Sequence, residues 1–460
     1  MTGLIIISLY FLGMLAIGIV SRRKARGADD FFVAGRRSST AFIIGSLLAT
    51  IIGGSATIGM AGLGFKQGLT GAWWLLVGSI GLVFLGLFLA KKVRSLALYT
   101  LPELVEKQYE RRMALATSIL IVVAWIGIIA AQIVAAGQIL SVLGIVSPII
   151  WMTIFTITFV TYTVLGGQHA VIRTDALQAV IILAGISGGV VLLLSRLGGW
   201  EGLQSSLPPE QFAFPLSTQF DGTRLVTLLL LVGLTYVVGP DMYSRIFCAK
   251  DEKTAKTATL WTALLTIPLA FAITLIGMGA AALFPNISPE QAFPVVIKEV
   301  FSPVLGGIVL AALLCAVMSS ADTTLLSAST ILTVDIIERF RPSPSQREIL
   351  PRSRWAIILL GICSLIVALA LKGVISALLF AYTIYTSGVI LPVIAGFFKD
   401  RLKVTPSGAL AALIGGGSAG LLSQLLEIKY LDLGALLLSG LLLFSVSFVD
   451  NRLKKQNSPA

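Results

Sequence analysis

The chain has 460 residues, of which 56% are hydrophobic and 12% are charged, and its mean hydropathy is +0.95. Because soluble domains carry about 25% charged residues, this composition indicates an integral membrane protein and excludes an ordinary soluble one. The formal net charge is +12, which by itself would also suit a nucleic-acid partner, so the placement of the charges has to decide between the two.

Residue types that would support other chemistry are scarce. The single histidine, His169, excludes a histidine-based metal site. No P-loop, nucleophile elbow or metalloprotease motif occurs, so the sequence predicts neither an enzyme nor a primary pump. The cysteines have neither metal nor disulfide spacing and are interpreted as packing residues: Cys248, Cys315 and Cys363.

Hydrophobic segments follow one another along the whole chain. A helix that crosses a bilayer needs about 20 apolar residues, and by that measure the sequence predicts about thirteen spans and no soluble domain. The first span is expected to stay in the mature protein, because it lacks the basic n-region and cleavage site of a signal peptide. The predicted spans cover 2–20, 40–65, 71–90, 114–143, 148–166, 174–195, 225–247, 258–284, 302–337, 355–371, 374–397, 406–426 and 431–449. We therefore expect one all-α transmembrane domain over residues 1–460.

The basic residues are unevenly distributed between the two sides of this predicted topology. If the N-terminus lies outside, 28 of the 34 Lys and Arg residues fall in segments on the inner side, Arg245 among them. Cytoplasmic segments of membrane proteins carry such an excess. The charge therefore predicts a multi-pass cell-membrane protein with an outer N-terminus and a cytoplasmic C-terminus, and no nucleic-acid partner. No segment indicates an obligate protein partner.

Two spans carry residues that break helices. The second predicted span contains Gly53–Gly54, and the seventh contains Gly239–Pro240, where the proline removes a backbone donor. Transporters built from inverted repeats interrupt the first helix of each repeat beside the binding site. The sequence thus predicts two inverted repeats, over 40–195 and 225–397. The alternative is that these glycines only allow close packing of helices.

The ninth span takes polar side chains into the membrane. Its run AVMSSADTTLLSAS includes Ser319, Ser320, Asp322 and Thr323. Charged groups inside spans are costly and usually functional. A hard monovalent cation prefers oxygen ligands, and carbonyls freed by a broken helix could complete its shell. For any single hydroxyl the alternative is a bond back to its own helix.

Two further carboxylates have open interpretations. Asp175 opens the sixth span, where it could complement the helix dipole and Arg173 or belong to a functional site. Asp241 precedes Arg245 by one helical turn, which is the spacing of an ion pair, and it would equally suit a substrate ammonium group or a proton site. The residues alone leave both questions open.

Together, the span pattern and the motifs ATIIGGSATIGM, GGQHAVIRTDALQ and AVMSSADTTLLSAS resemble the sodium:solute symporter family over essentially the whole chain. The resemblance implies a LeuT-like core of two five-helix inverted repeats, with broken helices in the second and seventh spans. It also implies sodium as the coupling ion, bound between the second and ninth spans. Carried over by motif, the ligands would be the carbonyls of Ala49, Ile52 and Ala316 and the hydroxyls of Ser319 and Ser320.

The resemblance further implies a second cation site in some members. That site lies between an aspartate of the sixth span and hydroxyls of the ninth, and its positions correspond here to Asp175, Asp322 and Thr323. Because Asp322 is a carboxylate where a hydroxyl is usual, the site is altered and could hold an ion or a proton.

The solute is less well defined. The run SSAD and the segment YSRIFCAKDEKTA are similar to the high-affinity choline transporter branch and its bacterial relatives. That branch places tryptophans at the positions of Ile51 and Asp241, so the aromatic cage that choline needs is missing and choline is not predicted. The polar contacts of sugar-transporting members fall on glycine and alanine here, which favours an amino acid, a small organic acid or an amine. The predicted solute contacts are Gly53, Ala56, Gln132, Tyr236, Asp241 and Tyr385.

The sequence therefore predicts a sodium-coupled symporter that imports a small polar organic solute by alternating access. A proton-coupled carrier of the same fold is the nearest alternative, with Asp322 or Asp175 as the titrating group. A transport-like sensor or a channel is a more distant alternative, because the short C-terminal tail carries no signalling domain.

Overall fold

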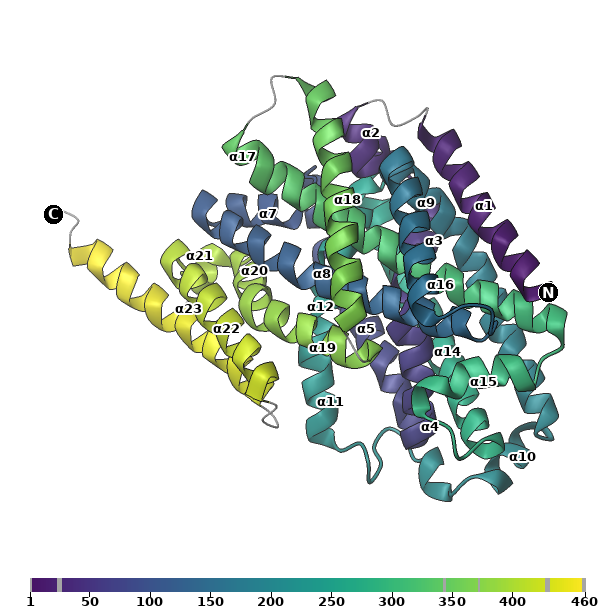
Figure 1. Ribbon diagram of the computed structural model, residues 1–460. Helices are drawn as coiled ribbons and strands as arrows, with labels where there is room; N and C mark the ends of the chain where they lie inside the picture. The colour runs from purple at the N-terminus through teal and green to yellow at the C-terminus, as the bar shows by residue number, and fades with distance from the viewer. Residues whose placement is uncertain (1, 23–26, 342–344, 371–372, 427–430, 457–460) are drawn as a thin grey trace.

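The computed structural model describes residues 2–22, 27–341, 345–370, 373–426 and 431–456. These residues are almost entirely helical, and their β-structure is limited to two isolated bridges, Ser38 with Ala249 and Ser217 with Phe220. Long helices run side by side through the molecule, with short helices at their ends (Figure 1).

The helices of the first part of the chain are α1 (Thr2–Arg22), α2 (Ala28–Val33), α3 (Thr40–Ile51), α4 (Met60–Gln67), α5 (Trp73–Phe84), α6 (Ala90–Ser95), α7 (Leu101–Gln108) and α8 (Arg111–Ser141). The middle part forms α9 (Pro148–Arg196), α10 (Gly199–Ser206), α11 (Gly222–Leu228), α12 (Leu234–Val237), α13 (Pro240–Cys248), α14 (Glu252–Leu283) and α15 (Ala292–Glu299). The last part forms α16 (Pro303–Ile331), α17 (Glu338–Phe340), α18 (Gln346–Ala370), α19 (Val374–Tyr385), α20 (Leu391–Gly396), α21 (Lys399–Leu402), α22 (Pro406–Leu426) and α23 (Leu431–Gln456). Short 3₁₀ or π turns are η1 (Ala34–Arg36), η2 (Ser55–Gly59), η3 (Gly68–Ala72), η4 (Leu85–Leu89), η5 (Pro209–Phe212), η6 (Leu229–Gly233), η7 (Pro289–Gln291), η8 (Leu332–Ile337) and η9 (Thr386–Ile390).

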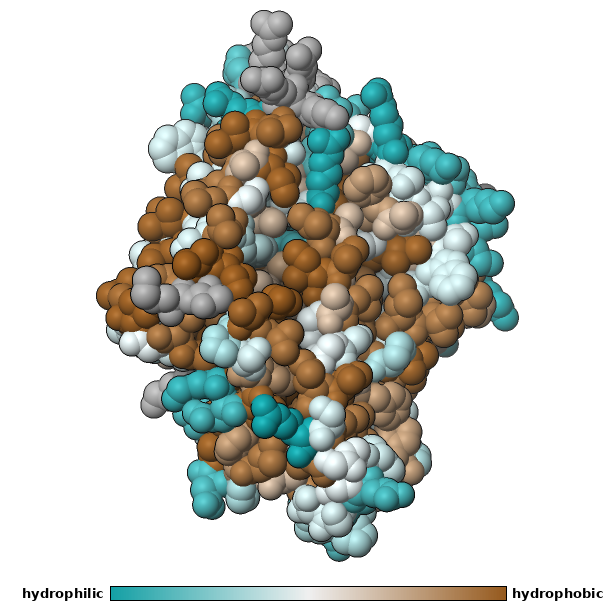
Figure 2. Space-filling view, turned by 90° about the vertical axis from the view of Figure 1, so that its right-hand side faces the viewer, coloured by the Kyte–Doolittle hydropathy of each residue, from teal (hydrophilic) through white to brown (hydrophobic). Residues whose placement is uncertain are grey.

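Eleven helical segments of the described chain are long and apolar enough to cross a membrane. The number is smaller than the thirteen predicted spans because two segments each contain more than one span. Ser55–Ser95 contains the end of the second span and the whole third span, and Pro148–Arg196 contains the fifth and sixth spans. Large apolar side chains such as Leu9, Val123 and Leu441 point outward. Figure 2 shows hydrophobic residues over the middle of one face, with hydrophilic residues mainly toward its upper and lower ends. The chain is a multi-pass membrane protein, as the composition predicts.

The long helix α9 differs from the two separate spans predicted over 148–166 and 174–195. It runs through a kink at Gly167, whose φ of 53° and ψ of −148° are not helical. A Cβ on Gly167 would lie 2.7 Å from the ring of Phe31, so glycine is required both for the backbone angle and for the close approach.

Both predicted helix breaks are present. Helix α3 ends at Ile51, and Ile52 has a ψ of 72° before the chain turns again into η2. The other break lies between α12 and α13, where Val238 has a non-helical ψ of 64°, Gly239 is extended and Pro240 opens the next helix. Proline fits a first helical position, because the backbone donor it lacks would have no intrahelical partner there. The two repeats over 40–195 and 225–397 stay a prediction.

Helix α16 forms the centre of the molecule. It packs against α8, α9, α1 and α3. In the most apolar stretch of 18 residues within Pro303–Phe340, 83% of the residues are buried inside the protein. Ser319, Asp322 and Thr323 are fully buried, so these polar groups must find their partners within the protein. This arrangement sets the polar run of α16 against the broken end of α3.

Candidate functional site

The first cluster of oxygen atoms lies where α16 meets the end of α3. The Ser319 hydroxyl donates to the carbonyls of Ala49 at 2.7 Å and Ala316 at 3.0 Å. The Ser320 hydroxyl donates to the carbonyls of Thr50 at 2.6 Å and Ala316 at 3.2 Å. The Ala49 and Thr50 carbonyls are available because α3 ends at Ile51, and the last carbonyls of a helix have no partner within it.

This cluster suits a hard monovalent cation. Two hydroxyls and three carbonyls converge, and neutral oxygen donors of this kind are the ligands that such ions prefer. Of the predicted ligands, Ala49, Ala316, Ser319 and Ser320 are brought together, and Ile52 is buried at the break beside them. The Thr50 carbonyl was not predicted, although its position at the last turn of α3 could have indicated it.

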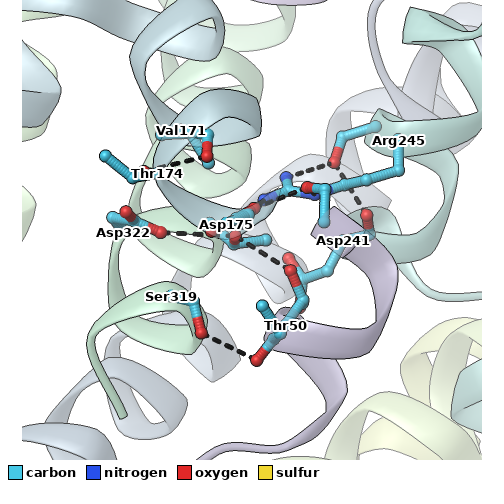
Figure 3. Close-up of polar contacts among 12 residues, drawn as sticks. Thr50, Val171, Thr174, Asp175, Asp241, Arg245, Ser319 and Asp322 are labelled. Carbon is cyan, nitrogen blue, oxygen red and sulfur yellow. Dashed lines mark hydrogen bonds and ion pairs between the residues drawn. The ribbon is translucent and has the colours of Figure 1, made fainter. Parts of the chain in front are cut away.

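A second cluster, the buried charge cluster, adjoins the first (Figure 3). The Asp175 carboxylate accepts hydrogen bonds from the Ser46 hydroxyl at 2.5 Å and from the Arg245 guanidinium at 3.1 Å. Arg245 also donates to Ser46 at 3.1 Å, to the Ser244 hydroxyl at 3.0 Å and to the Thr323 hydroxyl. The side chains of Asp175 and Arg245 are 0% exposed, so this is an ion pair removed from water.

Asp322 and Thr323 connect the two clusters. The Tyr162 hydroxyl donates to Asp322, and the Thr323 hydroxyl lies 3.4 Å from the other oxygen of that carboxylate. The Thr323 hydroxyl is also 3.1 Å from the Thr50 hydroxyl, beside the first cluster. The buried charge cluster therefore contains the carboxylates of Asp175 and Asp322 and the guanidinium of Arg245. It contacts the end of α3 through the hydroxyls of Thr323 and Thr50.

The ion pair of Arg245 answers two questions that the sequence left open. An interaction with Arg173 was one interpretation of Asp175, and an ion pair with Asp241 on the same helix was one interpretation of Arg245. In the structure its guanidinium is fully buried and pairs with Asp175 of α9 instead. The ion pair of Asp175 is likewise formed with Arg245, and not with its neighbour Arg173.

A cavity opens beside the first cluster. Thr50 and Ser320 contribute to its wall. Of the predicted solute contacts, four line it: Gly53, Gln132, Tyr236 and Asp241. Ala56 is buried and is not part of the lining. Tyr385 lies behind the lining, where its ring packs against Trp125 with centroids 4.9 Å apart and its hydroxyl donates to the Val238 carbonyl at the second break.

Trp125 also lines the cavity and contacts Asp241, and it was not among the predicted solute contacts. Its indole nitrogen donates to the Asp241 carboxylate at 2.8 Å. It lies on α8 roughly two turns before Gln132, so both face the same side of that helix, and this spacing was a usable signal. Tyr236 and Tyr382 line the cavity as well, and Asp241 is the one acid among the described lining residues.

The fold and these two clusters define a class of protein. A helical membrane protein with two broken helices, a cluster of oxygen atoms at one break and an adjoining cavity has the features of a LeuT-like secondary transporter. The model of the family described as SSF, the sodium:solute symporter family, matches residues 31–416, so the chain belongs to that family. The chain is therefore a sodium-coupled symporter that imports a solute by alternating access, and it is not an enzyme.

Curated relatives cover most of the chain at modest identity. Sodium/glucose cotransporter 4 of Homo sapiens is 27% identical over 477 residues, covering 92% of this chain and 69% of that protein. The sodium/pantothenate symporter of Escherichia coli (strain K12) is 26% identical over 465 residues, covering 96% and 95%. Among solved structures, a substrate-bound outward-open Na⁺-coupled sialic acid symporter has a TM-score of 0.83 at 18% identity, with 98% of each chain covered. That likeness shows the fold.

Proposed function

We propose that the coupling sodium ion is held by the hydroxyls of Ser319 and Ser320 with the carbonyls of Ala49, Ile52 and Ala316. The support is the convergence of these hydroxyls on carbonyls of α3 and α16 at 2.7–3.2 Å. Four neutral oxygens joined by hydrogen bonds through Ser319 and Ala316 need only small shifts to enclose a cation. The Ala49 and Ile52 carbonyls lie at the end of α3, where such shifts do not break intrahelical hydrogen bonds, whereas the Ala316 carbonyl is held in place within α16.

The solute binds in the adjoining cavity and carries a protonated amine. One observation carries this assignment: Asp241 lies in the wall with a neutral donor, the Trp125 indole, as its hydrogen-bond partner. Among the described residues that line the cavity none is Lys or Arg, so the carboxylate faces the solute without a cation in the lining. Tyr236 and Tyr382 add ring faces, which attract cations. A solute with only a carboxylate would meet repulsion from Asp241.

Ion and solute are coupled through a shared wall. Ser320 and Thr50 belong to the first cluster and also line the cavity, and Gly53 follows them at the break. Sodium that draws α16 and the end of α3 together fixes this wall of the solute site. Binding of either ligand then favours binding of the other, as reciprocal linkage requires.

The chain lies in the cell membrane with its N-terminus outside and its C-terminus in the cytoplasm. The support is the excess of basic residues in one set of connecting segments. Several of these segments, around α2, α7 and α17, lie toward the upper end of the molecule in Figure 1, while α10 and α15 lie toward the opposite end.

The solute assignment is tested by thermal stability of the purified protein in sodium, against matched sets of small amines, amino acids and carboxylic acids. Amine-bearing compounds are expected to stabilise wild type and to lose this effect in Asp241→Asn. Glu201→Gln, an exposed substitution outside the cavity, is the control and is expected to respond like wild type. Stabilisation by carboxylic acids alone would contradict the assignment. Stabilisation that follows acid pH and ignores sodium would favour the proton-coupled alternative.

A further inference from the structure

The guanidinium of Arg245 lies among the groups that the family resemblance assigns to a second cation. One nitrogen of Arg245 donates both to Asp175 and to Thr323, two of the three predicted ligands. The other nitrogens donate to the hydroxyls of Ser46 and Ser244 at 3.1 Å and 3.0 Å. The Asp175 Oδ2 and the Thr323 hydroxyl are therefore engaged by a positive charge that belongs to the chain, whereas the buried Asp175 Oδ1 has no hydrogen-bond partner among the described residues.

A metal ion does not fit between the same groups. A cation in contact with the Asp175 Oδ2 and the Thr323 hydroxyl would stand where the Arg245 nitrogen already bonds to both. Both members of the ion pair are 0% exposed, so no solvent screens the repulsion between the guanidinium and an added ion. The third predicted ligand, Asp322, is bonded to Tyr162, on another helix.

We propose that Arg245 is a fixed cation that takes the place of a second sodium ion, so that the protein binds one sodium ion per transport cycle. This inference rests on the proposed sodium site at Ser319 and Ser320. It assigns Asp175 a partner within the chain, and it assigns Thr323 a role in connecting that ion pair to the helix break through Thr50. Arg245 is thereby a residue that determines coupling stoichiometry, although it touches neither the sodium nor the solute.

The proposal makes opposite predictions for variants that keep or remove the charge. Arg245→Lys keeps one positive charge near Asp175 and is expected to bind one sodium ion. Arg245→Gln frees Asp175 and Thr323 and leaves an uncompensated buried carboxylate, so the variant is expected to recruit a second sodium ion. In the double variant with Asp175→Asn, that carboxylate is gone and the count returns to one.

The experiment is equilibrium binding of radioactive ²²Na⁺ to the detergent-purified full chain, which counts bound ions without any transport. We expect one ion per wild-type chain and two in Arg245→Gln. Two ions in wild type would overturn the proposal, and so would a count of one in a folded Arg245→Gln. If Arg245→Gln does not fold, the counts for wild type and Arg245→Lys still decide, since two ions in either would refute it. No bound ion in wild type would refute the proposed sodium site on which this inference rests.

Discussion

Gly53 is the position at the first helix break where one added methyl group should weaken sodium binding most directly. A Cβ at this position would lie 2.5 Å from the Ser320 hydroxyl and 2.9 Å from the Gln132 amide oxygen. Both neighbours would have to move, and overpacking of this kind costs about 1–3 kcal/mol of stability. The Ser320 hydroxyl would be pushed from the first cluster, and losing one contact to a charged ligand costs about 1.5 kcal/mol or more, about tenfold in sodium affinity.

The assay is sodium titration of thermal stability for Gly53→Ala beside Gly127→Ala. Gly127 lies in α8, and the nearest atom to an added Cβ there is 3.7 Å away, an ordinary contact. Alanine in a helix is favoured over glycine by about 1 kcal/mol, so the control is expected to be as stable as wild type or more so, with unchanged sodium affinity. Wild-type sodium affinity in a folded Gly53→Ala would refute the placement of Ser320 in the ion site.

Three further substitutions test the breaks and the cavity. Trp125→Phe keeps an aromatic ring near Tyr385 but removes the donor to Asp241, so we expect the apparent solute affinity to fall by about tenfold, with sodium affinity unchanged; equal KM values for uptake in both proteins would contradict this. Tyr385→Phe removes the donor to the Val238 carbonyl, and we expect a loss of about 1 kcal/mol in thermal stability that does not depend on sodium. Gln132→Leu leaves the Gly54 amide, now bonded at 2.8 Å, without its acceptor, and a loss of about 1–3 kcal/mol is expected in chemical-denaturation or melting experiments; no loss would show that the amide finds another partner.

The helix breaks and the first oxygen cluster were predictable from the sequence because their signals are local. Pro240 cannot continue a helix, and paired glycines weaken one, so these positions identify themselves without any tertiary information. Ser319 and Ser320 stood out as adjacent hydroxyls in an apolar span. The carbonyls of Ala49, Ile52 and Ala316 were implied by the resemblance to the sodium:solute symporter family and not by the residues alone, and the Thr50 carbonyl was not predicted.

The buried charge cluster was not predictable in the same way. Asp175 and Arg245 are 70 residues apart, and only the packing of α9 and α13 against α3 and α16 brings them together. From the sequence, Arg245 could not be distinguished from the basic residues that set topology. Trp125 and Asp241 are 116 positions apart, and their hydrogen bond likewise depends on how α8 faces the second break.

The central claim is that sodium binds at Ser319 and Ser320, and the most direct measurement is thermal stability in sodium against potassium at matched ionic strength, for wild type and Ser319→Ala. An ion that binds only the folded protein at 100 times its Kd raises stability by about 2.7 kcal/mol. The account predicts a saturable, sodium-specific increase in wild type that is lost in Ser319→Ala. Equal effects of sodium and potassium on wild type, or a sodium effect that persists in Ser319→Ala, would contradict it.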